Sequence, residues 1–227
     1  MGLPYLNAQE IQEQKQRIAV AMAHKPNYFI RSGEVLRLVE KLADKNHQIL
    51  EVGCGAGDLA SSMIDQGYHH LDLLDIDDYL RDDIKNRVHL ALADLSYNKL
   101  PYTDNKFDLL LAIAIVEHLE NPYNFVREAA RVLKPGAKML MAIPYIFSWR
   151  SRWRFMTRGD LFGYSKQNNH ITLFTKAVFN KVFWPHFNLE QEIYGESYVE
   201  IFGRKLKFSG GGKYFSNKIL YILEKKK

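Results

Sequence analysis

The sequence predicts an α/β fold in which helices cover both faces of a mostly parallel β-sheet. Short apolar segments alternate with amphipathic ones from residue 33 to residue 143. The first apolar segment, Gln48-Ile49-Leu50, leads directly into a glycine-rich stretch, and the alternation stops after Pro144. Strands that are apolar throughout are buried on both faces, as in parallel sheets flanked by helices. At 227 residues, the chain is expected to form a single domain, residues 1–227.

The first clear helix is expected over residues 33–44, where Val35, Leu36, Val39 and Leu42 recur at helical spacing. Residues 8–23 carry a weaker helical signal, so residues 1–45 are expected to form an N-terminal helical segment. The elements that follow are expected at residues 48–53 (strand), 58–66 (helix), 70–76 (strand), 77–86 (helix), 88–93 (strand) and 107–116 (strand).

The second half of the chain begins with a helix from Asn121-Pro122, because Asn is a good N-cap and Pro suits the first helical turn. Lys134-Pro135-Gly136 is expected to end this helix. After Pro144, a basic, aromatic insertion or lid occupies residues 145–170. The remaining elements are expected at residues 137–143 (strand), 175–182 (helix), 189–194 (strand) and 218–223 (strand).

The glycine-rich stretch reads Glu51-Val52-Gly53-Cys54-Gly55-Ala56-Gly57. A strand, a glycine loop and a helix in this order form a nucleotide-type pocket at the carboxyl end of the first strand. The dinucleotide pattern G-x-G-x-x-G would need a glycine at position 58, where the chain has Asp58. Cys54 is the only cysteine, which excludes an internal disulfide, and it is expected to be a small packed residue rather than a reactive thiol.

Glu51 and the spacing G-x-G-x-G resemble motif I of the class I S-adenosylmethionine-dependent methyltransferases. Val116-Glu117-His118-Leu119 and the segment from Arg131 to Gly136 extend the resemblance over residues 45–145, with Ala137 where that family usually has a second glycine. The resemblance implies a Rossmann-like class I methyltransferase sandwich, with a seven-stranded sheet whose last strand is antiparallel. It also implies that the chain is an S-adenosylmethionine-dependent methyltransferase.

The resemblance assigns cofactor-binding roles along the strand ends. Glu51 is expected at the methionine end of S-adenosylmethionine, and Asp75 is expected to accept the ribose hydroxyls. An acidic residue at a strand end can also simply face solvent, and the glycine loop favours the ribose role. The remaining expected cofactor contacts are the loop residues Gly53, Cys54, Gly55 and Gly57, and the adenine-side residues Ile76, Asp94 and Leu95.

Two histidines are candidate catalytic residues. His118 could be a general base for a hydroxyl, since its ordinary pKa is near neutrality, or it could merely border the cofactor. His170 precedes a Phe-Thr segment typical of these enzymes, and it is either a substrate-side residue or a helix-cap histidine. Some related quinone-pathway enzymes bind a metal with a further carboxylate three residues before the Glu-His pair. That position is Ala114 here, so no metal is expected.

The C-terminal part is basic. Residues 1–144 hold 16 Lys and Arg against 20 Asp and Glu, a net charge of −4, whereas residues 145–227 hold 15 against 6, a net charge of +9. On a helix, Trp149, Trp153 and Met156 would share one face. Arg150, Trp153 and Arg154 are therefore expected to bind an anionic acceptor. The alternative is an ordinary lid helix with packed aromatic residues and solvated arginines.

The function that these features favour is O-methylation of a small-molecule or glycan acceptor, as in bacterial cell-surface polysaccharide pathways. A quinone or lipid acceptor is the alternative within the same class, with peripheral membrane contact. An RNA methyltransferase or nucleic-acid binder is disfavoured, because the chain lacks an RNA-binding module. A non-catalytic scaffold would not need the intact glycine loop. No leader or membrane-spanning segment is evident, and a cytoplasmic location is expected.

Overall fold

The computed structural model describes residues 12, 33–164, 169–195, 197–201, 204–208 and 212–227. The weak helical signal over residues 8–23 lies outside this part of the chain, apart from residue 12. Within the described residues, no helix is both long enough and apolar enough to cross a bilayer.

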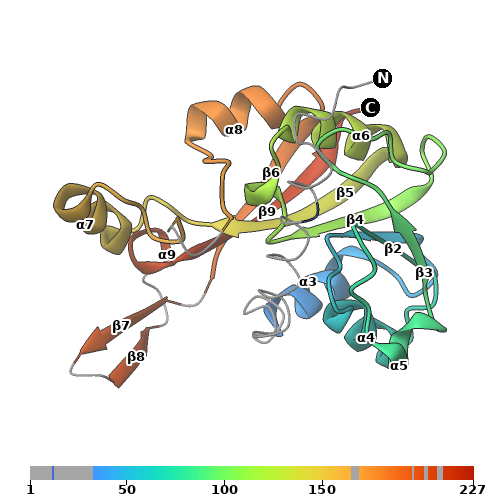
Figure 1. Ribbon diagram of the computed structural model, residues 1–227, viewed down its shortest axis with the longest axis horizontal. Helices are drawn as coiled ribbons and strands as arrows, with labels where there is room; N and C mark the ends of the chain where they lie inside the picture. Colours follow the sequence, from blue (N-terminus) through green and yellow to red (C-terminus); the bar gives the residue numbers. More distant parts are fainter. Residues whose placement is uncertain (1–11, 13–32, 165–168, 196, 202–203, 209–211) are drawn as a thin grey trace.

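A seven-stranded sheet forms the centre of the molecule, with the strand order β3-β2-β1-β4-β5-β9-β6 (Figure 1). β1 lies between β2 and β4 and is parallel to both, so that Ile49 stands opposite Leu71 and Leu109. β9 is antiparallel to both of its neighbours. This arrangement confirms the predicted sheet and its antiparallel last strand. The bounds are β1 Ile49–Val52, β2 Leu71–Asp75, β3 His89–Leu92, β4 Phe107–Ile113, β5 Leu133–Pro144, β6 Phe187–Tyr194 and β9 Lys218–Lys225.

Helices lie on both faces of the sheet, as the apolar strands require. In Figure 1, α3, α4 and α5 lie on one side, and α6 and α8 lie on the other. The side chains of β4 alternate between two hydrophobic cores, with Leu109 and Leu111 facing α3 and α4, and Leu110 and Ala112 facing α6 and α8. The bounds are α3 Glu34–Leu42, α4 Asp58–Asp65, α5 Asp82–Lys85, α6 Pro122–Val132 and α8 Lys176–Phe183.

Three local expectations were wrong. The helix expected over residues 77–86 is only the four-residue α5. β5 begins at Leu133 instead of Ala137, because Leu133 already pairs with Phe107 and the left-handed Gly136 (φ 78°) is absorbed in an irregular start of the strand. The chain before β9 also forms elements that were not expected: a hairpin of β7 (Ser197–Ile201) and β8 (Arg204–Phe208), and the short helix α9 (Gly212–Phe215).

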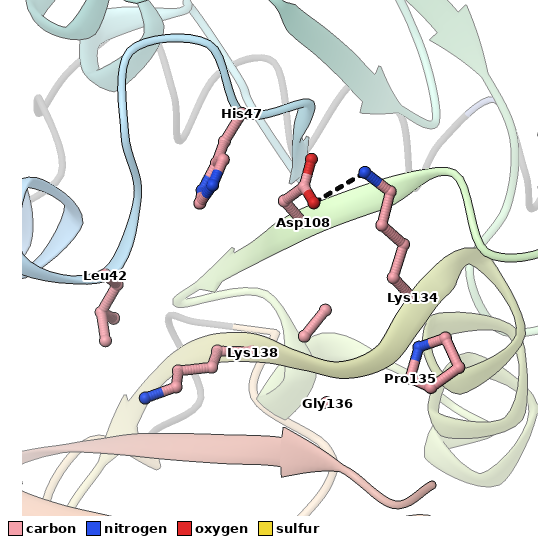
Figure 2. Close-up of a pocket in the computed structure, with 8 residues that line it drawn as sticks. Leu42, His47, Asp108, Lys134, Pro135, Gly136 and Lys138 are labelled. Atoms are coloured by element: carbon pink, nitrogen blue, oxygen red, sulfur yellow. Dashed lines mark hydrogen bonds and ion pairs between the residues drawn. The ribbon is translucent and has the colours of Figure 1, made fainter.

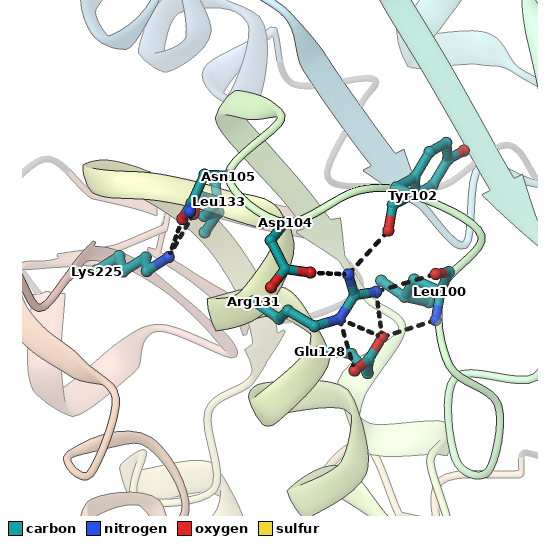
Figure 3. A network of polar contacts seen from close by, with 8 residues as sticks. All are labelled: Leu100, Tyr102, Asp104, Asn105, Glu128, Arg131, Leu133 and Lys225. Atoms are coloured by element: carbon teal, nitrogen blue, oxygen red, sulfur yellow. Dashed lines mark hydrogen bonds and ion pairs between the residues drawn. The ribbon is translucent and has the colours of Figure 1, made fainter.

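A polar network around Arg131 holds the connection between β3 and β4 against α6 (Figure 3). Its guanidinium donates to the Glu128 carboxylate, to Asp104 Oδ1 at 2.7 Å and to the Tyr102 carbonyl at 2.8 Å. Glu128 Oε2 in turn accepts the Leu100 N–H at 2.8 Å. Because both charged side chains are largely buried, the network fixes the loop that follows the third strand.

The insertion contains the expected helix, α7 (Trp149–Arg158). Ser148 caps its first turn by accepting the Ser151 N–H, and Gly159 ends it in a left-handed conformation (φ 70°). α7 begins shortly after the carboxyl end of β5 and projects beyond the sheet (Figure 1).

Candidate active site

The glycine loop after β1 depends on its glycines for conformation and for space. Gly53, Gly55 and Gly57 all have positive φ, at 67°, 53° and 81°. A Cβ on Gly53 would lie 2.6 Å from the side chain of Ile115, which follows β4. The loop therefore packs its backbone against the end of a neighbouring strand, where only glycine fits.

Asp75 joins the end of β2 to this loop. Its two carboxylate oxygens accept the N–H groups of Gly55 at 2.8 Å and Ile76 at 2.7 Å. The side chain is buried, and burial raises its pKa while the two backbone hydrogen bonds act in the opposite direction. Each oxygen keeps a further lone pair for a ligand hydroxyl.

Glu51 is the most unusual group of the loop, because it is a buried acid without a cationic partner among the described residues. Its residue is 4% exposed, and no described residue donates a hydrogen bond to its Oε2. Burial, followed by repulsion from Asp75 and Asp58, raises the pKa of Glu51 to about 8. A buried acid of this kind is stabilised when a cation binds beside it.

Cys54 is buried between these carboxylates. Burial, together with the charges of Glu51 and Asp75, raises the pKa of the thiol well above its ordinary value. A thiol that stays protonated is a poor nucleophile, so Cys54 is a packed residue of the loop.

The residues expected on the adenine side lie at the ends of β2 and β3. Ile76 is partly exposed, and Asp94 Oδ1 accepts the Ser96 N–H at 2.8 Å. Leu95 is only 5% exposed and packs in the core beside α6, so its side chain is less open to a ligand than expected. The Ala93 N–H donates to the Asp75 carbonyl, which ties the two strand ends together.

A third group of side chains follows β4, in the short 3₁₀ helix η1 (Val116–His118). Glu117 is almost fully buried, and its carbonyl accepts two N–H groups at 3.0 Å, from Ile171 and Thr172. These bonds bring His170 against His118, with ring centroids 4.6 Å apart. The two candidate catalytic histidines, far apart in the sequence, therefore form one cluster with Glu117.

The hydrogen bonding of His118 defines its tautomer. Nδ1 lies 3.2 Å from the Asn169 carbonyl, which can only accept a hydrogen bond. The ring proton is therefore assigned to Nδ1, and Nε2 carries the lone pair. Burial lowers the pKa of His118, and burial with the neighbouring His118 lowers that of His170 to about 4, so both rings are neutral at pH 7.

The cluster also contains group types that bind metals. One ligand atom each from Glu117, His118 and His170 can be chosen so that all lie within 4.8 Å of one another. The expectation of no metal was based on Ala114, and in the structure a nitrogen of His170 lies beside Glu117 and His118 as a third candidate ligand atom. Ala114 itself has a positive φ of 55°, which turns the chain from β4 into η1.

The three residues expected to bind the acceptor lie on α7. Trp153 is 59% exposed. The guanidinium of Arg150 stacks 4.9 Å above the Phe162 ring, and Arg154 donates to both carboxylate oxygens of Asp160. Both arginines therefore have partners within the insertion, and the Asp160 carboxylate would compete with an anionic acceptor for Arg154.

A hollow of about 290 Å³ lies at the other end of the strands from the glycine loop (Figure 2). It is lined by His47, before β1, and by Asp108 and Lys134, which form an ion pair of 2.7 Å. Ligands of open α/β sheets bind at the carboxyl ends of the strands, and this hollow lies at the amino ends of β1 and β4. The glycine loop and the histidine cluster are therefore the better candidate site.

Comparison with known proteins shows what the central part of the chain is similar to. Residues 50–141 match the family model of a methyltransferase domain. The chain is 30% identical over 120 residues to the methyltransferase GfsG of Streptomyces halstedii, covering 47% of this chain and 42% of that one. It is 24% identical over 123 residues to a ubiquinone biosynthesis O-methyltransferase of Coxiella burnetii, covering 52% of each chain. It thus spans about half the length of these relatives.

Among solved structures, a SAM-dependent methyltransferase from Archaeoglobus fulgidus has the same fold, with a TM-score of 0.61, 14% identity, and coverage of 88% of this chain and 100% of that one. Its sheet architecture is the one found here, while the low identity limits the likeness to the fold. Together, the family model, the relatives and the fold identify residues 50–141 as a methyltransferase domain of the class I S-adenosylmethionine-dependent type.

Proposed function

We propose that the protein transfers a methyl group from S-adenosylmethionine to a hydroxyl oxygen of a glycan or other small-molecule acceptor. The observation that carries the proposal is the buried Glu51 carboxyl, whose Oε2 has no donor among the described residues. This methyl donor is a cation with an additional ammonium group, so it fits a buried acidic pocket. The donor supplies a methyl group already activated by its positively charged sulfur.

The residues of the loop would bind and orient the donor. The Glu51 carboxylate would accept a hydrogen bond from the ammonium group of the donor. The free lone pairs of Asp75 would accept hydrogen bonds from the ribose hydroxyls. Gly53 and Gly57 would hold the loop backbone in its left-handed turns, packed against Ile115 and Leu80, and Ile76 and Asp94 would border the adenine. Because the methyl group is already activated, alignment and exclusion of water are the main tasks left to the chain.

His118 would take the proton of the acceptor hydroxyl. Its Nε2 carries the lone pair, and its Nδ1–H is held by the Asn169 carbonyl. His170 would keep the ring in place by edge-to-face packing at 4.6 Å. The neutral state of His118 is the one that can accept a proton.

A quinone or other lipid acceptor is the second candidate. It is supported by the relative named as a ubiquinone biosynthesis O-methyltransferase and by the exposed aromatic residues of α7. An RNA acceptor has no comparable support in the described residues.

Two measurements test the proposal. S-adenosylmethionine at 100 times its Kd should stabilise the protein by about 2.7 kcal/mol, which a thermal-shift assay detects. Transfer of a labelled methyl group should then be screened over nucleotide sugars, lipid-linked glycans, quinols and RNA. No thermal shift would contradict the cofactor assignment, whereas label found only on nitrogen or on RNA would contradict the acceptor class.

A further inference from the structure

The apolar face of α7 points away from the protein. Trp149, Trp153 and Met156 fall on one side of the helix and are 63%, 59% and 81% exposed. Ser151, two residues from each tryptophan and therefore on the opposite side, is completely buried. An amphipathic helix that packs on its own domain has the reverse orientation.

Specific polar contacts fix this orientation. Ser151 Oγ accepts the Phe162 N–H at 3.1 Å, on the inner side of the helix. The bidentate Arg154–Asp160 pair and the stacking of Arg150 on Phe162 hold the segment after α7 against the helix. Turning the tryptophans inward would break these contacts, so their exposure belongs to the folded state.

α7 also carries positively charged side chains. α7 contains four arginines and no acidic residue. Arg154 is paired with Asp160, whose pKa is also lowered by the charge of Arg158, while Arg152 and Arg158 are exposed and form no ion pair with the described acidic residues. At helical spacing, Arg150 and Arg152 flank the tryptophan face, whereas Arg158, seven residues after Ser151, lies on the opposite side at the end of the helix.

Further exposed aromatic residues surround this helix. Phe147, which precedes it, is 36% exposed, and Phe155 is 59% exposed. α7 contacts α9, where Tyr214 is 58% exposed. Exposed aromatic side chains therefore occur on α7, directly before it and on the neighbouring α9, as at many interaction surfaces.

We propose that α7 docks the protein on the surface of an anionic lipid bilayer, with Trp149, Trp153 and Met156 entering the interface and the arginines contacting lipid headgroups. Tryptophan combines an apolar body with an N–H that suits the interface, and arginine can extend its charge toward the headgroups. Short basic helices with an apolar face lie in the plane of the membrane surface. α7 is about 15 Å long, from a rise of about 1.5 Å per residue, and so lies on a bilayer without crossing it.

The geometry favours a bilayer over nucleic acid. Met156, the most exposed residue of the face, has no ring on which a base could stack. Only Arg150 and Arg152 flank the apolar face, and its centre carries no cation that could contact a phosphate backbone. This inference does not depend on the proposed methyl transfer.

Intrinsic fluorescence can test the docking directly, because two of the three tryptophans of the chain lie on α7. A Trp184→Phe variant of the full-length protein leaves only Trp149 and Trp153 to report. It should be titrated with vesicles of phosphatidylcholine alone and with vesicles containing one-quarter phosphatidylglycerol, at low and at high salt. We expect a blue shift with the anionic vesicles, quenching by lipids spin-labelled near the headgroup, and weaker binding at high salt.

Matched variants separate the contribution of the apolar residues of α7 to vesicle binding from that of its arginines. Trp149→Ser with Trp153→Ser and Met156→Ser should reduce sedimentation with anionic vesicles at least tenfold, while Trp184→Ser, which removes a 48%-exposed tryptophan elsewhere, should not. Arg152→Ala should weaken binding about fivefold, whereas Arg158→Ala, on the opposite side of the helix, should weaken it less. Circular dichroism melting must show that each variant is folded.

Four outcomes would overturn the proposal. The first is that the folded wild-type protein does not sediment with anionic vesicles at low salt. The second is that Trp184→Ser loses as much binding as the triple variant. The third is an emission shift caused by polyuridylate and not by vesicles, which would assign the surface to nucleic acid. The fourth is concentration-dependent dimerisation in light scattering that buries both tryptophans, which would assign it to a second copy of the chain.

Discussion

The backbone N–H of Gly55 donates a 2.8 Å hydrogen bond to Oδ2 of Asp75, 20 residues further along the chain. The bond joins the glycine loop after β1 to the end of β2, the two elements between which the cofactor is proposed to bind. The carboxylate therefore shapes the loop as well as offering lone pairs to a ligand. A substitution at Asp75 should affect both.

Asp75→Ala should weaken S-adenosylmethionine binding about 10- to 150-fold, because a charge-assisted hydrogen bond is worth about 1.5–3 kcal/mol. Asp75→Asn keeps one oxygen that can accept the Gly55 N–H, so its affinity for S-adenosylmethionine should fall less than that of Asp75→Ala. Asp82→Asn, on the exposed surface of α5, is the matched control. Calorimetry measures the affinities, and an unchanged affinity in folded Asp75→Ala would refute the ribose assignment.

Gly53→Ala should abolish cofactor binding and destabilise the fold, because the new Cβ would lie 2.6 Å from Ile115. Gly67→Ala is the control, since Gly67 has φ 90° but open space for 4 Å around the position that a Cβ would take. It should cost only the strain of a left-handed alanine, about 1–2 kcal/mol. Adding Ile115→Ala should recover part of the stability lost by Gly53→Ala. Equal melting temperatures for the two alanine variants would show that the close approach to Ile115 is unimportant.

Glu51 should release a proton when the cofactor binds. In the folded protein its pKa is about 8, so at pH 7 the carboxyl is mostly protonated, and an adjacent ammonium group would favour the ionised form. Calorimetric titrations at pH 7 in two buffers of different ionisation enthalpy should show this proton release. Glu51→Gln should bind S-adenosylmethionine more weakly and should release no proton on binding. Proton uptake by the wild-type protein would contradict the assignment.

The same residue predicts a pH dependence of stability. The pKa of Glu51 is raised on folding from 4.5 to about 8, so the folded state retains a proton that the unfolded state loses in this window. The contribution of Glu51 to stability is therefore greatest below about pH 4.5 and declines as the pH rises to 8. Glu51→Gln should stabilise the cofactor-free protein at pH 8 by up to a few kcal/mol, since one pKa unit is worth about 1.4 kcal/mol, and have little effect at pH 4.5. Denaturant unfolding measures this, and an equal effect at both pH values would contradict it.

His118→Ala should lower kcat about 10²- to 10⁴-fold, the usual contribution of a general base, and leave cofactor affinity unchanged. His170→Ala should lower it less, because His170 acts on the orientation of His118. A chelator should have no effect on the wild-type rate. Loss of the rate with a chelator, and its recovery with a divalent ion, would instead assign Glu117 and the two histidines to a metal.

Arg131→Ala should destabilise the protein by about 2 kcal/mol or more, because it leaves the largely buried Glu128 carboxylate without its cation. For a chain of this size, that lowers the Tm by roughly 4–8 °C. Arg127→Ala, an exposed position on the same helix, should change the Tm by little. Similar melting of both variants would mean that the network is not a source of stability.

The central sheet and the glycine loop could be predicted because their signals are local: continuous apolar strands, and glycines at fixed positions after Glu51. The start of β5 could not, because Pro135-Gly136 is also a good helix terminator and only pairing with β4 decides between the two. The contact between His118 and His170 depends on hydrogen bonds from Ile171 and Thr172 to Glu117, which no periodicity indicates. Likewise, the spacing of the tryptophans predicted one shared face on α7, but not that this face would point outward.

The carbonyl of Glu117 holds two successive N–H groups of the chain that returns from the insertion, while β5 holds the outgoing chain at Pro144. The insertion is thus a loop clamped at both ends beside the histidine cluster. Changes of length or sequence between these clamps need not alter the distance between the two imidazole rings. The sequence between these two anchored ends can therefore change without moving His118 and His170. Related chains with a different insertion would keep the histidine pair and contact a different acceptor or surface.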